Sequence, residues 1–79
     1  MVIKEQISLK DIADNTTVRL LKIDAGAGLK SRLSAMGLLP GTEFKVINNG
    51  HPGPFVISLK GSRLMLGRGM AAKIFVKTV

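Results

Sequence analysis

The side chains that could perform catalysis are few in this chain. Its 79 residues contain no Cys and a single His, His51, which lies in a loop rich in Gly and Pro. A nucleophile needs a positioned base within hydrogen-bond reach, and none of the five serines has an evident one in the sequence. The sequence therefore predicts that the chain is not an enzyme, with no catalytic residues and no cofactor.

A metal site would have to use very few ligands. Transition-metal sites in proteins draw on His and Cys, with carboxylates in support. Asp11 and Asp14 are spaced i, i+3 and could face the same way on one turn, where they would cap and solubilise it. The sequence predicts no metal ligands, although a weak transition-metal site shared between two copies at His51 stays open as an alternative.

The positive charge of the chain has two interpretations, an anionic partner or a solvated surface that keeps a small domain soluble. Twelve Lys and Arg residues against five Asp and Glu give a net charge of +7, which attracts polyanions, acidic proteins and anionic lipid. Binding of single-stranded nucleic acid usually combines such cations with stacking aromatic side chains. The chain has three Phe and no Tyr or Trp, and Phe44 and Phe55 fall on inward faces, which leaves only Phe75 as a candidate stacking platform. A protein partner is favoured, and a basic nucleic-acid-binding barrel is the alternative.

A docking surface is predicted where a helix passes into a turn. Leu38 and Leu39 are adjacent large apolar residues that cannot both easily point inward, and cations on the preceding helix lie close by. Exposed apolar groups rimmed by basic residues suit an apolar and acidic protein surface. The predicted partner-binding residues are Lys30, Arg32, Leu38, Leu39, Pro40 and Gly41.

The elements that must position this surface are a helix and a tight turn. Leu29, Leu33 and Met36 stand at i, i+4 and i+7, which predicts one apolar stripe on a short helix within residues 24–37. Gly37 suits the left-handed position that closes a helix. Pro40-Gly41 is typical of a type II turn, because Pro fixes φ at its second position and Gly accepts positive φ at its third.

The rest of the chain has strand character. Residues 17–23 break strict alternation at Leu20–Leu21, which indicates a β-bulge. Gly61-Ser62 predicts a type II′ hairpin turn. Ser8, followed three residues later by Asp11, predicts a capped helical turn in residues 7–14. Further strands are predicted at residues 42–48, 55–60, 64–66 and 74–76, with a single helical turn at residues 70–72.

These elements predict a mainly β protein. About five short strands with one short α-helix inserted after the first strand favour a small barrel, whose closure removes exposed sheet edges. The length allows one domain, residues 1–79. No stretch approaches the roughly 18 apolar residues of a membrane span, no signal peptide is evident, and the lack of Cys fits a reducing compartment. A cytoplasmic location is expected.

One segment is more specific than these general patterns. Residues 33–46 read Leu-Ser-Ala-Met-Gly-Leu-Leu-Pro-Gly-Thr-Glu-Phe-Lys-Val. Together with Gly53-Pro54, the Leu64–Leu66 segment and Ala71 before a last apolar strand, this order and spacing resembles the FeoA family. Members of that family are small cytoplasmic accessory proteins of bacterial ferrous-iron uptake. The resemblance runs from about residue 7 to the end of the chain.

The resemblance implies a fold and a partner. The fold would be an SH3-like barrel, and the partner would be the cytoplasmic G-protein domain of the ferrous-iron transporter FeoB, whose transport the protein would modulate. A similar domain lies at the C-terminus of metal-dependent repressors of the DtxR type, but this chain has no DNA-binding portion, so a repressor role is not expected. The protein would be a monomer or a weak homo-oligomer, reaching the membrane only through the transporter.

Overall fold

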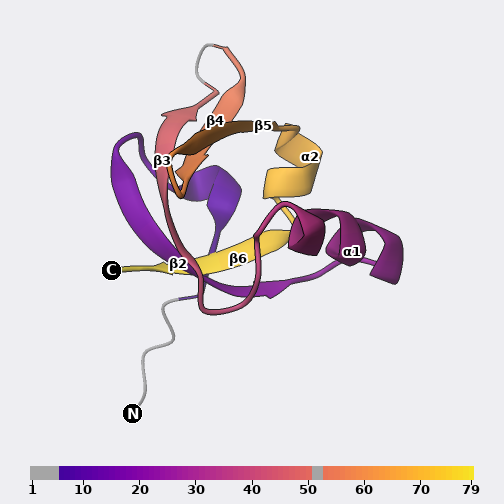
Figure 1. The fold of residues 1–79 in the computed structure, drawn as a ribbon. Helices are drawn as coiled ribbons and strands as arrows, with labels where there is room; N and C mark the ends of the chain where they lie inside the picture. The colour runs from indigo at the N-terminus through magenta and orange to yellow at the C-terminus, as the bar shows by residue number, and fades with distance from the viewer. Residues whose placement is uncertain (1–5, 51–52) are drawn as a thin grey trace.

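One antiparallel sheet of six strands forms most of the molecule (Figure 1). The computed structural model describes residues 6–50 and 53–79. The strands follow the spatial order β1-β6-β2-β3-β4-β5, so the last strand lies between the first two. Their bounds are β1 Ile7–Ser8, β2 Thr16–Ile23, β3 Glu43–Asn49, β4 Phe55–Leu59, β5 Ser62–Leu66 and β6 Ile74–Thr78.

The long strand β2 carries the predicted bulge. Its register against β6 shifts between Leu20 and Lys22, where the sequence alternation fails. An extra residue in one strand of an antiparallel pair bends that strand and increases its local twist. β2 can therefore pair with both β3 and β6 and still curve around the core.

The hairpin of β4 and β5 follows the predicted alternation but uses a different turn. Phe55, Ile57 and Leu59 of β4 are buried, as their spacing predicted. Leu59 pairs with Ser62, so the two central turn residues are Lys60 and Gly61, with φ of 51° and 84°. Two successive positive φ values are typical of a type I′ turn, so the predicted II′ turn centred on Gly61-Ser62 is wrong.

The N-terminal helical turn is present, but its predicted cap is wrong. Leu9–Asp11 form the short 3₁₀ helix η1, and Ser8 precedes it without capping its backbone. The Ser8 hydroxyl instead donates to the carbonyl oxygen of Ala72 at 3.2 Å. This bond ties β1 to the residue that follows the short helix α2, Arg68–Ala71, which matches the predicted C-terminal helical turn.

The helix α1, Ala27–Ala35, ends in a complete Schellman motif. Gly37 has a φ of 97°, and its N–H donates to the carbonyl of Ser34 at 2.9 Å. The N–H of Leu38 donates to the carbonyl of Leu33, also at 2.9 Å, which is the second bond of that motif. Leu33 is buried and Leu29 packs against the core, but Met36 is exposed, so the predicted apolar stripe stops one turn early.

The apolar core lies inside the curled sheet and includes residues from every strand except the short β1. Among the residues that the structure describes, sixteen hydrophobic side chains are buried, including Leu9 of η1, Leu33 of α1 and Ala71 of α2. The protein is mainly β, as predicted. Within the described residues no hydrogen-bonded ladder joins β5 to β1, so the sheet is not closed and the prediction that closure removes its edges is wrong. No helix in the described part of the chain is long and apolar enough to cross a membrane.

Candidate docking site

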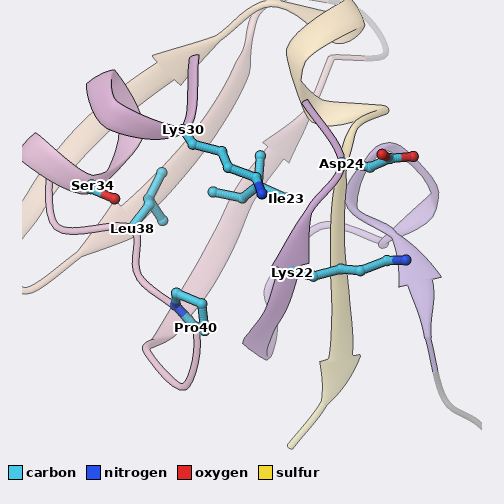
Figure 2. A pocket seen from close by; sticks show the side chains of 7 residues that line it. All are labelled: Lys22, Ile23, Asp24, Lys30, Ser34, Leu38 and Pro40. Atoms are coloured by element: carbon cyan, nitrogen blue, oxygen red, sulfur yellow. The ribbon is translucent and has the colours of Figure 1, made fainter. Parts of the chain in front are cut away.

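A pocket of about 330 Å³ lies between α1, the end of β2 and the turn that follows α1 (Figure 2). Ile23 and Leu38 give it an apolar floor, since both side chains are buried. Figure 2 shows Lys30 reaching from α1 towards Ile23, whereas Lys22 points away from Leu38 and Pro40. The lining residues are Lys22, Ile23, Asp24, Lys30, Ser34, Leu38 and Pro40.

Backbone hydrogen bonds hold the turn against β2. Gly41 donates its N–H to the Leu20 carbonyl at 2.8 Å, and Leu20 donates to the Thr42 carbonyl at 2.9 Å. Thr42 also donates to the Leu39 carbonyl at 3.0 Å, which closes a four-residue turn with Gly41 at a φ of 91°. These are the features of the predicted type II turn, and they hold Pro40 at the rim of the pocket.

The two adjacent leucines point in opposite directions. Leu38 is fully buried, whereas Leu39 is 48% exposed. The expectation that both cannot point inward is thus met, and Leu38 is buried rather than exposed, while its part in partner binding stays a prediction. Leu38 belongs to the core and supports the pocket from below, because the Schellman motif turns its backbone inward directly after Gly37.

The structure brings together most of the remaining predicted surface. Lys30 and Pro40 line the pocket, and Leu39 and Gly41 are exposed beside Pro40 on the same turn. Arg32 is exposed but does not line the pocket, because it follows Lys30 by two residues and a helix turns about 200° over that interval.

Sequence reasoning missed four lining residues: Lys22, Ile23, Asp24 and Ser34. Ser34 could have been found, since it stands at i+4 from Lys30 and therefore on the same helix face. The end of β2 carried no such signal, because its approach to the turn at Pro40 depends on the bulge and on the hydrogen bonds of Leu20.

The aromatic residue that remained for stacking is already in contact with a cation. The Lys22 ammonium lies 5.5 Å from the centroid of the Phe75 ring, within the range of a cation–π interaction. Phe75 is itself half-buried in β6. The geometry therefore offers a weaker base-stacking platform than the sequence alone suggested.

The carboxylates considered as metal ligands are engaged elsewhere. Asp11 forms an ion pair with Lys10 at 3.1 Å, and Asp14 accepts a hydrogen bond from the Asn49 backbone N–H at 2.7 Å. In residues 6–50 and 53–79 no three His, Asp or Glu side chains are grouped to hold a metal ion. His51, the other candidate, lies outside the described residues.

Taken together, the curled antiparallel sheet and the helix after β2 define a small SH3-like domain. The fold is shared with solved structures. A crystal structure of an iron uptake regulatory protein, FeoA, matches with a TM-score of 0.85 at 27% identity, over 94% of this chain and 99% of that one. An IdeR structure from T. acidophilum, at 16% identity and a TM-score of 0.84, covers this whole chain with 37% of its own and shows the fold alone.

The family follows from the sequence comparisons. The model of the FeoA domain matches residues 7–78. A protein of Methanocaldococcus jannaschii that bears the provisional name Fe(2+) transport protein A is 52% identical over 56 residues, which are 71% of this chain and 67% of the relative. The chain belongs to the FeoA family, and it is an accessory protein of Fe(2+) transport.

Proposed function

We propose that this protein acts in the cytoplasm by docking onto the cytoplasmic G-protein domain of a FeoB-type ferrous-iron transporter and modulating transport. Membership of the FeoA family supports the assignment to Fe(2+) transport. The observation that supports docking through this site is the apolar pocket beside the exposed side chain of Leu39. The proposed docking surface consists of Lys30, Leu39, Pro40 and Gly41 around the pocket, with Arg32 at its periphery.

Two kinds of interaction would contribute to the affinity. Leu39 and the pocket floor of Ile23 and Leu38 offer apolar area that a partner side chain could remove from water. Lys30 and the net charge of +7 would raise the rate of encounter with an acidic partner. Pro40 adds a rigid edge, because its ring fixes the backbone of the turn.

Replacement of Leu39 by Asp tests this surface. The partner used is the purified cytoplasmic G-protein domain of the transporter, and the measurement is its dissociation constant by calorimetry or fluorescence anisotropy. Docking would bury the remaining 48% of the Leu39 side chain, about 0.7–1.4 kcal/mol of the roughly 1.5–3 kcal/mol for a whole leucine. Placing a carboxylate in that contact costs about 1–3 kcal/mol more, so the affinity should fall by about 20-fold or more.

A matched control distinguishes the loss of a specific contact at Leu39 from the effect of one added negative charge. Val79 is another exposed apolar residue, at the end of the chain and remote from α1 (Figure 1). Val79→Asp changes the net charge by the same amount and should leave the affinity within about twofold. Equal affinities of Leu39→Asp and the unsubstituted protein would show that the docking surface lies elsewhere.

A further inference from the structure

The strand β5 is one edge of the sheet, and none of its residues lines the docking pocket. It pairs with β4 on one side, and its five residues Ser62–Leu66 have no strand on the other side within the described structure. An edge strand presents unpaired N–H and C=O groups, which are a template for a further strand. The short β1 is the opposite edge and has only two residues.

The register identifies which backbone groups are free. A two-residue turn joins Leu59 and Ser62, so Ser62, Leu64 and Leu66 are the β5 residues that exchange hydrogen bonds with β4. The N–H and C=O groups of Arg63 and Met65 therefore point to the open edge. Within residues 6–50 and 53–79 these groups have no hydrogen-bond partner.

The side chains of the same two residues are exposed on the outer face of the sheet. Met65 is 72% exposed, the highest value among the large hydrophobic residues described. It lies opposite Val56 of β4, and Arg63 lies opposite Ser58, which in turn pairs with Lys45 of β3. An apolar row and a basic row thus run side by side towards the open edge.

The charge along this part of the chain has one sign. Residues 44–66, which include β4 and β5, contain three cations and no Asp or Glu: Lys45, Lys60 and Arg63. Glu43, the acidic residue just before them, is held by Arg19 in an ion pair of 2.5 Å. An anionic partner is therefore favoured at β5, and a second copy with its own charge of +7 is disfavoured.

We propose that the β5 edge binds an extended acidic segment of a partner protein by β-strand addition. The backbone of the segment would pair with Arg63 and Met65, an acidic residue would face Arg63, and an aliphatic residue two positions along would face Met65, since same-face residues of a strand are two apart. This surface is separate from the pocket, so the proposal holds whether or not the pocket binds the transporter.

A short synthetic peptide provides the test. The probe is a fluorescein-labelled eight-residue peptide that repeats Glu-Glu-Val-Val, so that Glu and Val alternate along each face of the extended strand, and it is titrated into the protein at low salt. The backbone readout is amide hydrogen exchange by NMR. We expect the Arg63 and Met65 amides to exchange freely in the protein alone and to slow by about tenfold or more with the peptide at saturation. The Leu64 and Leu66 amides serve as an internal control, because β4 already accepts their hydrogen bonds.

Variants separate the contributions of charge and backbone. Arg63→Glu should weaken the peptide by about fivefold to tenfold, because an attractive exposed pair becomes a repulsive one. Lys77→Glu, on the distant strand β6, makes the same change in net charge and should have an effect of about twofold or less. A peptide methylated at alternate amide nitrogens keeps every side chain but loses its donors, and it should not bind.

Four results would overturn the proposal. Slow exchange of the Arg63 and Met65 amides in the free protein at low concentration would mean that the edge is already covered. Protection that appears only as protein concentration rises, with a dimer by light scattering, would assign the edge to a second copy. Unchanged peptide affinity in Arg63→Glu, or binding of the methylated peptide, would show that the peptide binds without strand addition.

Discussion

The contrast between Leu38 and Leu39 gives the most direct test of the structure. Leu38 is fully buried in the core, and its neighbour is 48% exposed on the turn. Truncation of a buried leucine to alanine costs about 2–5 kcal/mol, through lost transfer free energy and the cavity that remains. A domain of 79 residues has a total unfolding free energy of about 4–12 kcal/mol, so Leu38→Ala should consume a large part of it.

The expected change in melting temperature follows from the size of the domain. At about 2.1 cal/mol/K per residue, 79 residues give an unfolding entropy of about 0.17 kcal/mol/K, so each 1 kcal/mol lowers Tm by about 6 °C. Leu38→Ala should therefore lower Tm by about 12–30 °C. Leu39→Ala removes a side chain that is only half-buried and should cost about 1 kcal/mol, or about 6 °C.

Circular dichroism at 222 nm during heating, with urea unfolding of the same samples, measures both variants. Leu39→Ala serves as the matched control, because it makes the same chemical change one residue further along the chain. Equal Tm values for the two variants, or a loss below about 6 °C for Leu38→Ala, would refute the conclusion that the Schellman motif places Leu38 in the core.

Two further predictions concern stability. Gly37→Ala should destabilise the protein by about 1–2 kcal/mol in urea unfolding, because the φ of Gly37 is 97° and an added Cβ would lie 3.3 Å from Leu59 Cδ2. Gly28→Ala, in α1 with open space around it, should instead stabilise the protein by about 0.5–1 kcal/mol. A change of the same sign for both variants would contradict the backbone conformation assigned to the two glycines. Arg19 and Glu43 form an ion pair with side chains that are 41% and 45% exposed. A double-mutant cycle on the unfolding free energy should give the pair a coupling energy of about 0.2–1 kcal/mol that decreases with added salt. A coupling energy that does not change between low and high salt would show that the pair is not a screened surface ion pair.

Local patterns in the sequence were sufficient for most of the elements. Alternation placed Phe55, Ile57 and Leu59 in the core, the break in alternation located the β2 bulge, and Pro40-Gly41 located the turn. These signals are reliable because each depends on a few neighbouring residues: a strand alternates its faces, and only certain residues accept positive φ. The motif around Met36-Gly37 also carried the resemblance to the FeoA family, which the comparisons confirm.

Some local predictions were wrong where two structures could satisfy the same residues. Ser8 could have capped η1, but its hydroxyl bonds to Ala72, 64 residues away. Lys60 adopts a φ of 51°, which is uncommon for a residue that is not Gly, so the hairpin turn begins one residue earlier than predicted. The Ser8–Ala72 hydrogen bond decided the first case, and the register of β4 and β5 decided the second.

The candidate site likewise depends partly on local sequence and partly on contacts between distant elements. Composition and spacing by themselves determined that this is a small, basic, mainly β chain with an apolar and cationic segment at the end of its helix. Only the tertiary structure decided that Leu38 points into the core while Leu39 points out, that Arg32 leaves the pocket, and that Ile23 and Asp24 enter it. The physical reason is that burial and pocket formation depend on the approach of elements distant in sequence. Here the Leu20–Gly41 and Leu20–Thr42 hydrogen bonds hold the turn against β2.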